Sequence, residues 1–422
     1  MAIARDRTDG PASPVDGRYA CFRLALSVLL GTIGSIGMWA VVVILPAVQA
    51  EFGVDRAGAS VPFTFMMFGF AFGNLVGGRY VDRLGIVPPV IAAALALGLG
   101  FTLAAQADSI WLFSTIHGVL IGVGTAICFG PLLANISHWF ERRRGIAVAA
   151  VASGNYIAGA IWPTILQGFV ESDGWRVTYT GMGIMCVVTM VPLALLLRRK
   201  APSEIEAAEN NGVHSIPPSH IIDLSPRALR LLLAIAGIAC CVAMSMPMVH
   251  IVAYCSDLGF AAARGTEMLS ILLFSAFLSR VAYGWLADRV GGLRTLLLGS
   301  ALQLLGLACY MYADTLEDLY MVSVFYGLGY GGIVPMYAII IRELFHDSQA
   351  GWRIGVVFLF GTSGMAMGGY IGGFIYDLTA AYSLAFLTGI GFNLINLLLV
   401  GFMVLRQGGL GGRRGRLVLS EA

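Results

Sequence analysis

The sequence is poor in charged residues. Asp, Glu, Lys and Arg make up only 12% of its 422 residues, against roughly 25% in soluble domains. Hydrophobic residues make up 58%, and the mean hydropathy is +0.82. This composition excludes an ordinary soluble domain, and the lack of a basic run interleaved with aromatic residues argues against a nucleic-acid partner. We therefore expect most of the surface to face a lipid bilayer.

Cysteine patterns and catalytic motifs are also missing. The seven cysteines lie mainly in apolar runs, and no CxxC or Cys/His spacing links them, which argues against a disulfide framework or a metal site. No nucleophile–base pair or phosphate-binding loop stands out. The sequence predicts neither an enzyme nor a protein with a bound cofactor. Residues 1–22 are polar and contain Asp and Pro, so we expect a cytoplasmic tail rather than a cleaved signal peptide.

Long apolar runs are abundant instead, and each is long enough to cross a bilayer as a helix. Twelve runs are expected to be helices, at 23–48, 58–81, 86–106, 110–136, 145–169, 177–198, 229–254, 263–286, 293–312, 318–341, 355–376 and 382–405. We predict an all-α membrane protein in which two pseudo-symmetric six-helix bundles occupy residues 23–198 and 229–405. A polar cytoplasmic linker, 199–228, joins the bundles, and residues 406–422 form a second cytoplasmic tail.

The distribution of cations sets the expected orientation. Of the 26 lysines and arginines, only Arg56, Arg176 and Arg264 fall between runs on one side, and Arg280 falls inside a run. The others flank the runs on the opposite side, which also carries both termini. Because short cytoplasmic segments retain positive charge, both termini are expected in the cytoplasm. The compact loops are compatible with a bacterial inner membrane.

The two halves repeat one sequence motif. Gly78-Arg-Tyr-Val-Asp82-Arg83-Leu-Gly85 follows the second run, and Gly284-Trp-Leu-Ala-Asp288-Arg289-Val-Gly291 follows the eighth, 206 residues later. An aspartate at a helix terminus can pair with arginines of a neighbouring loop. We therefore predict a conformational latch formed by Gly78, Asp82, Arg83, Gly284, Asp288 and Arg289. Parallel repeats of this kind are typical of transporters, in which the substrate site lies between the halves near the membrane midplane.

Arg280 is the most informative single residue. It interrupts the apolar run 271–284, and an arginine in the middle of a membrane helix costs about 2.5–3.5 kcal/mol on insertion scales. Such a residue usually faces a polar cavity and binds an anion. Snorkelling to the interface is the alternative, but the helix continues for six residues to Leu286. A guanidinium in low dielectric pairs well with a carboxylate, so Arg280 predicts a carrier of organic anions.

These motifs resemble those of the major facilitator superfamily over roughly residues 20–405, because its loop signature matches 78–85 and 284–291. Within that superfamily the chain is similar to the monocarboxylate porters. The segment 16–20, Asp-Gly-Arg-Tyr-Ala, is close to the motif before their first helix, and 138–154 resembles the start of their fifth helix. Arg18 departs from the first motif, where Gly or Ser is usual. Oxalate–formate antiporters share much of this pattern.

The resemblance implies the major facilitator fold and a substrate role for Arg280, since the family places its substrate arginine at the matching position of the eighth helix. The aspartate that precedes it by one turn in animal members is Ala276 here, and an expected first-helix lysine is Ala40. Oxalate carriers are expected to have a second cation in the eleventh helix, but 361–377 has no basic residue. One buried cation favours a monocarboxylate over a dicarboxylate.

We predict a secondary active transporter of lactate-like or pyruvate-like monocarboxylates that works by alternating access as a single chain. Carrying an anion inward against a negative-inside potential costs about 2.3 kcal/mol per charge per 100 mV, which a co-transported proton cancels. Proton symport is therefore expected, and organic anion exchange of the oxalate–formate type is the alternative. Efflux of hydrophobic compounds and a membrane receptor or enzyme are weaker alternatives.

Several further residues are candidates for these roles. For the proton they are Asp257 and His250, at the outer part of the seventh helix, and His117, for which packing is the stronger interpretation. The alternative interpretation of Asp257 is an ordinary acidic residue of a loop. For substrate binding they are Tyr326 and Tyr330, which share a helix face, with Asn155 and Tyr156. Aromatic packing is the alternative for the two tyrosines of the tenth helix.

Overall fold

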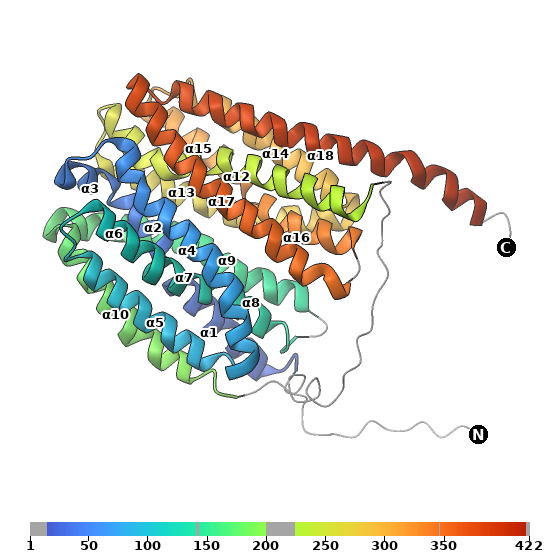
Figure 1. Ribbon diagram of the computed structural model, residues 1–422, viewed down its shortest axis with the longest axis horizontal. Coiled ribbons are helices and arrows are strands. Elements are labelled where there is room, and N and C mark those ends of the chain that lie inside the picture. The colour runs from blue at the N-terminus through green and yellow to red at the C-terminus, as the bar shows by residue number, and fades with distance from the viewer. Residues whose placement is uncertain (1–14, 141–142, 200–223, 346, 419–422) are drawn as a thin grey trace.

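The fold consists of two side-by-side groups of helices (Figure 1). The computed structural model describes residues 15–140, 143–199, 224–345 and 347–418, and every regular element in these ranges is helical. Within them, twelve segments are long and apolar enough to cross a membrane. The predicted fold class is therefore confirmed, and several spans agree closely with the apolar runs, such as Ile110–Ile136 for the run 110–136.

The N-terminal half contains six spans, two of which are interrupted. Its elements are α1 (Arg18–Gly34), α2 (Ile36–Val43), α3 (Leu45–Phe52), α4 (Arg56–Leu84), α5 (Val87–Ala104), α6 (Ile110–Ile116), the π-helical segment η1 (His117–Gly122), α7 (Val123–Ile127), α8 (Gly130–Ile136), α9 (Arg144–Asp173) and α10 (Trp175–Leu195). The first span comprises α1 to α3, and the fourth comprises α6 to α8. Pro131 lies in the first turn of α8, where a missing backbone N–H is tolerated.

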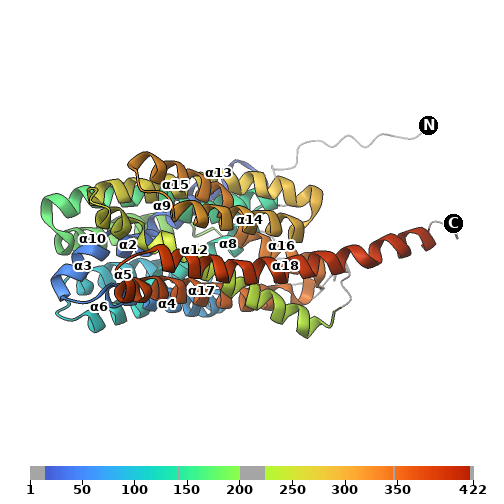
Figure 2. The same ribbon diagram turned by 90° about the horizontal axis from the view of Figure 1, so that it is seen from above.

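The C-terminal half has the same number of spans and one interruption. Its elements are α12 (Pro226–Asp257), α13 (Ala262–Val290), α14 (Gly292–Tyr310), α15 (Leu316–Tyr330), α16 (Ile333–Leu344), α17 (Asp347–Thr379) and α18 (Ser383–Val418). The tenth span is split into α15 and α16 by a turn at Gly331 and Gly332. Figure 2 shows α18 projecting beyond the other helices.

The start of α1 and the end of α18 lie at the same end of the bundle, here called the termini end; the other end is the opposite end (Figure 1). The repeated motifs close at the termini end of α4 and α13. Their last residues, Gly85 and Gly291, have φ angles of 75° and 89°. Glycine adopts positive φ at little cost, so backbone geometry explains why both copies of the motif end in glycine.

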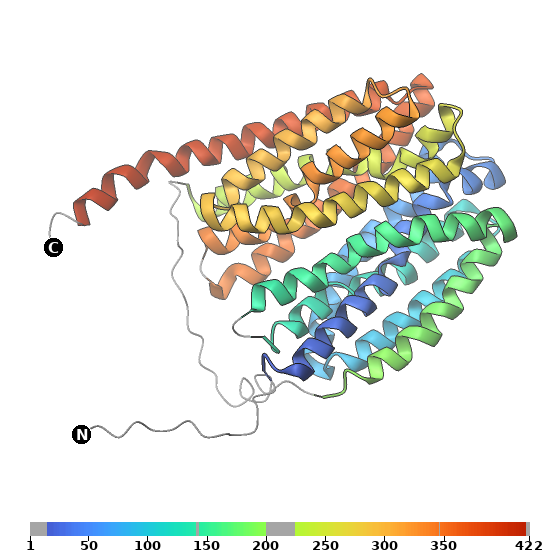
Figure 3. The same ribbon diagram turned by 180° about the vertical axis from the view of Figure 1, so that it is seen from behind.

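The two halves meet along α4 against α17 and α9 against α13, and Figure 3 shows α9 in green beside α13 in yellow. Near the middle of the span, Thr64 donates to the carbonyl of Ala366 at 3.2 Å. Thr164 and Ser270 are hydrogen bonded at 3.0 Å. Among the described residues, the hydrogen bonds and ion pairs that join the halves run from the opposite end to the level of Arg280, and none lies nearer the termini end. In the described part of the chain, the halves are therefore bonded to each other from the opposite end to the level of Arg280.

Candidate functional site

Arg280 lies at the interface between the halves. Its helix, α13, continues to Val290, ten residues farther, so Arg280 is about 15 Å from the termini end at 1.5 Å per residue. Its Nη1 donates to the carbonyl of Ala152 on α9 at 2.9 Å. Its guanidinium lies over the ring of Tyr156, 4.1 Å from the centroid. Both contacts cross from the C-terminal to the N-terminal half, which makes snorkelling to the interface the wrong interpretation of this residue.

Among the described residues, the guanidinium of Arg280 has no carboxylate partner. The ion pairs in the described part of the chain are Arg56–Asp257, Arg176–Glu51 and Arg264–Glu267. Among the described residues, Arg280 also donates to the carbonyl of Gly331, from Nε at 3.4 Å. Its Nη2 has no hydrogen-bond partner among the described residues and is not a buried atom. Because a carboxylate binds well to a pair of guanidinium donors, this unused edge has the chemistry of an anion site.

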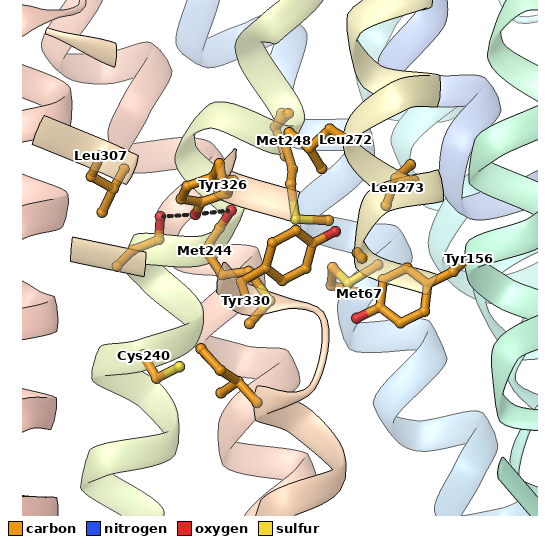
Figure 4. Close-up of a cluster of buried hydrophobic side chains, with 14 of the residues drawn as sticks. Met67, Tyr156, Cys240, Met244, Met248, Leu272, Leu273, Leu307, Tyr326 and Tyr330 are labelled. Atoms are coloured by element: carbon orange, nitrogen blue, oxygen red, sulfur yellow. Dashed lines mark hydrogen bonds between the residues drawn. The ribbon is translucent and has the colours of Figure 1, made fainter. Parts of the chain in front are cut away.

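Apolar side chains and two tyrosines surround this level of the interface. Figure 4 shows Tyr156 on one side and Tyr330 on the other, with their hydroxyl groups directed into the region between the halves. Their ring centroids are 6.1 Å apart. The Tyr330 hydroxyl is buried and has no hydrogen-bond partner. The apolar neighbours, which belong to one continuous core cluster, are Met67, Met244, Met248, Leu272 and Leu273. An unpaired buried hydroxyl is costly unless something polar reaches it, so Tyr330 fits a ligand contact.

The polar atoms of the other two predicted substrate residues have partners within their own halves. The buried hydroxyl of Tyr326 donates to the carbonyls of Ala243 and Met244, each at 3.3 Å, within its own half. The side-chain and backbone oxygens of Asn155 accept from Nε1 of Trp39, at 3.2 and 3.0 Å. Asn155 therefore orients an indole ring of its own half. The structure brings together Arg280, Tyr156 and Tyr330. The ring of Tyr326 lies 5.3 Å from that of Tyr330, but its hydroxyl, like the side chain of Asn155, is hydrogen bonded within its own half.

Asp257, a proton-coupling candidate, closes the opposite end of the interface. Both of its carboxylate oxygens accept from Nη2 of Arg56, at 2.9 and 3.0 Å. Arg56 begins α4 in the N-terminal half, whereas Asp257 ends α12 in the C-terminal half. The Arg56 guanidinium also lies 4.7 Å from the centroid of the Tyr376 ring. Asp257 therefore joins the two halves through its ion pair with Arg56, which is here called the gate, and it is not an isolated loop acid.

His250 is buried on α12 behind this gate. Its Nε2 contacts the carbonyl oxygen of Gly369 at 2.7 Å, and its Nδ1 contacts the hydroxyl of Tyr382 at 3.2 Å. The Tyr382 ring lies 4.7 Å from that of Tyr376, which packs under Arg56. Rings and hydrogen bonds thus connect His250 to the gate, although it does not touch Asp257 directly.

His117 lies in the core of the N-terminal half. Its Nδ1 contacts the carbonyl of Phe113 at 2.8 Å, and its Nε2 contacts the hydroxyl of Tyr179 at 3.3 Å. It packs, with tilted ring contacts, in an aromatic cluster that includes Phe113 and Tyr179. These contacts fit the packing interpretation, and they keep His117 away from the interface between the halves.

Asp377 also joins the halves at this end, and no feature of the sequence singled it out. Its carboxylate oxygens accept from the backbone N–H groups of Arg56 and Ala57, at 2.8 and 2.7 Å. The acid belongs to α17, and the N–H groups belong to the first turn of α4 in the other half. A carboxylate at a helix N-terminus satisfies free donors and complements the helix dipole. No spacing signals this contact, because the partners are 321 and 320 residues apart.

The predicted latch residues lie at the termini end. Asp288 and Arg289 are exposed. The Arg289 guanidinium lies 3.6 Å from the ring centroid of Trp285, and Asp288 has no ion pair among the described side chains. Gly284 has open space around it, and Arg83 is exposed. The surroundings of Gly78 and Asp82 lie outside the described part.

No group of three or more described His, Cys, Asp or Glu residues could hold a metal ion.

Two six-helix halves that meet at an interface, where the described residues give Arg280 no carboxylate partner, fit a membrane transporter. The family model of the Major Facilitator Superfamily matches residues 28–324 and 231–415. The chain belongs to this superfamily.

Individual relatives agree with this assignment. The chain is 28% identical over 325 residues to monocarboxylate transporter 13 of Rattus norvegicus, covering 76% of this chain and 74% of that protein. It is 24% identical to the MFS-type transporter YhjX of Escherichia coli, covering 78% and 83%. Among solved structures, an inward-facing, occupied bacterial homologue of the human lysosomal transporter Spinster aligns with a TM-score of 0.69 at 13% identity, covering 92% and 97%. The nucleoside transporter NupG aligns with a TM-score of 0.71 at 11% identity, covering 90% and 99%.

Proposed function

We propose that this transporter carries small monocarboxylates of the lactate or pyruvate type. The observation that carries the proposal is the Nη2 edge of Arg280, which lies at the interface of the halves and has neither a hydrogen-bond partner nor an acid beside it among the described residues. A substrate carboxylate would supply the missing negative charge. The hydroxyl of Tyr330 is buried and unpartnered nearby, and it suits the hydroxyl or keto oxygen of such an acid.

A single charge on the substrate fits this site best. Besides Arg280, the described helices bring no second unpaired cation to the level of Tyr156 and Tyr330, and the stretch 361–377 of the eleventh span contains no basic residue. A dicarboxylate would leave one charge without a partner in low dielectric, at a cost of several kcal/mol. The name of the mammalian relative, a monocarboxylate transporter, supports the same class of substrate.

Transport would be coupled to protons and proceed by alternating access. Asp257 and His250 are the candidates for the proton, because one holds the gate at the opposite end and the other is connected to it through Tyr382. Protonation of Asp257 would weaken its ion pair with Arg56 and favour opening of that end. The termini would then be cytoplasmic and the gate would face outward, as in a bacterial inner membrane.

The test is uptake of labelled lactate and pyruvate into proteoliposomes, with and without an inward proton gradient. Arg280→Gln is expected to lower kcat/KM at least about 30-fold, since loss of one partner of a buried charge pair costs about 2–5 kcal/mol. Arg264→Gln is the matched control, because Arg264 begins the same helix and pairs with Glu267 on the exposed surface. It is expected to retain uptake within about twofold.

Three outcomes separate the alternatives. Saturable uptake that an inward proton gradient stimulates and that depends on Arg280 supports proton symport. Counterflow from preloaded vesicles with no proton dependence selects the anion exchanger. Equal uptake by the wild type and Arg280→Gln would contradict the proposal, because Arg280 would then have no part in binding.

A further inference from the structure

The break in the tenth span lies directly beside Arg280. α15 ends at Tyr330 and α16 begins at Ile333, with a turn at Gly331 and Gly332. In a continuous α-helix, the carbonyl of Gly331 would accept from the N–H of residue 335. Residue 335 is Pro335, which has no N–H. The sequence therefore removes the ordinary backbone donor of one carbonyl at this break.

Two side chains of α13 donate hydrogen bonds to backbone carbonyls at this break and just before it. Nε of Arg280 donates to the carbonyl of Gly331 in a long hydrogen bond of 3.4 Å. The hydroxyl of Tyr283, one turn farther along α13, donates to the carbonyl of Gly329. Two neighbouring carbonyls of the tenth span are thus bound by two side chains from the same face of α13.

The two glycines of the break allow this close approach. A Cβ atom at Gly331 would lie 2.2 Å from the carbonyl oxygen of Ala276, and one at Gly332 would lie 2.1 Å from the Tyr283 ring. Both distances are too short for real atoms. The break is therefore in direct contact with α13 on both sides of Arg280, and any change in its backbone hydrogen bonding acts on that arginine.

We propose that Pro335 is a positioning residue for Arg280. By withholding an N–H, it leaves the carbonyl of Gly331 to the guanidinium Nε, which holds Arg280 so that its Nη2 edge stays free. With alanine at 335, a local N–H competes for that carbonyl at all times, and the long bond from Nε is lost. This inference rests on the proposed function, because the free edge is the part that binds the carboxylate.

The same device occurs once more in the C-terminal half. Pro247 lies inside α12, and the carbonyl four residues before it is that of Ala243, which accepts from the hydroxyl of Tyr326 at 3.3 Å. There too a proline removes the backbone N–H donor of a carbonyl, and a side-chain hydroxyl donates to that carbonyl instead.

In the fourth span, Pro131 removes the donor for the carbonyl of Ile127, to which no described side chain donates. Pro131 is therefore the matched control for Pro335.

The test is a double-mutant cycle in uptake kinetics. Pro335→Ala is expected to raise KM for the monocarboxylate about fivefold, the order of one modest charged hydrogen bond, while kcat changes less than about twofold. In the Arg280→Lys background, whose ammonium has no Nε, the same change should alter KM less than twofold. Pro131→Ala should leave KM unchanged. An unchanged KM in Pro335→Ala, or an equal factor in both backgrounds, overturns the proposal.

A second measurement separates this inference from the proposed function. Melting temperatures of the four purified proteins of the cycle report coupling between Pro335 and Arg280 without any substrate. We expect the two substitutions to be non-additive, because they act on one carbonyl. Additive shifts would overturn the positioning role even if monocarboxylate uptake depended on Arg280. Absence of monocarboxylate uptake in the wild type would defeat the proposed function, whereas the melting cycle would still decide the role of Pro335.

Discussion

Two arginines lie between the halves of this transporter, and their surroundings differ in one respect. Arg56 and Arg280 each stack on a tyrosine of the other half, at 4.7 and 4.1 Å from the ring centroids. Arg56 is bound through both oxygens of Asp257. Arg280 has only the carbonyls of Ala152 and Gly331. The same type of side chain is thus paired with an acid of the protein in one place and, among the described residues, left without an acid in the other.

This difference assigns the two arginines to different tasks. A guanidinium that already has a carboxylate can gain little from an anionic ligand, but its pair must break whenever the halves separate. We therefore expect Arg56 to control closure of the opposite end. A guanidinium held only by carbonyls keeps its charge uncompensated, which favours an added carboxylate. Removal of an acid that holds Arg56 should therefore change how often the gate opens and leave the affinity for the monocarboxylate at Arg280 intact.

The largest effect on the gate is expected from Asp257→Ala. The side chain of Arg56 is 7% exposed and that of Asp257 is 27% exposed, so the pair is worth more than a surface pair but less than a fully buried one. We expect the opposite end to open about tenfold more often, equivalent to about 1.4 kcal/mol. The measurement is the maleimide labelling rate of a cysteine at Thr64, in a background without the seven native cysteines.

Glu51→Ala is the control for this prediction, because Glu51 pairs with Arg176 inside the N-terminal half. It removes an ion pair without loosening the contact between the halves, so the labelling rate should stay the same. The monocarboxylate KM should change less than twofold in Asp257→Ala. A large loss of affinity together with unchanged labelling would reverse the roles assigned to Arg56 and Arg280.

A smaller effect is expected from Asp377→Ala. This carboxylate accepts from two backbone N–H groups of α4, and a helix cap is worth about 0.5–2 kcal/mol. The labelling rate at position 64 should rise about fourfold. Asp55→Ala is the matched control, since Asp55 caps the same helix from its own half by accepting from the N–H of Gly58 at 2.7 Å. If both variants raised labelling equally, Asp377 would only stabilise α4 and would not hold the halves together.

Most of the architecture could be predicted because it depends on local patterns. A run of apolar residues must be helical to satisfy its backbone in lipid, so runs such as 110–136 give the span directly. Arg280 could be singled out without knowing its neighbours, because the free-energy cost of placing an arginine in an apolar run follows from the sequence alone. Polar helix ends were missed: α1 begins at Arg18 and α12 at Pro226, because residues at the end of a span need not be apolar.

Contacts between the halves could not be predicted from such patterns. From the sequence, Arg56 was only one of the cations between apolar runs, yet it pairs with Asp257, 201 residues away. Tyr326 and Tyr330 share a helix face, but one hydroxyl bonds to backbone carbonyls of its own half and the other has no partner. Which side of a membrane helix faces a neighbouring helix depends on the packing of all the helices. Hydrophobic periodicity carries little of that information when lipid and core are both apolar.

The smallest effect on this conformation is expected from Asp288→Asn. The residue is exposed and has no ion pair among the described side chains, so the melting temperature should not change measurably, as for most surface substitutions. Turnover should nevertheless fall about twofold if Asp288 pairs with loop arginines when the termini ends come together, because exposed ion pairs are worth about 0.2–1 kcal/mol. Asp314→Asn, an exposed acid at the opposite end, should alter neither quantity. A lower melting temperature with normal turnover would mean that Asp288 stabilises the closed gate conformation described here, and the predicted latch at the termini end would be wrong.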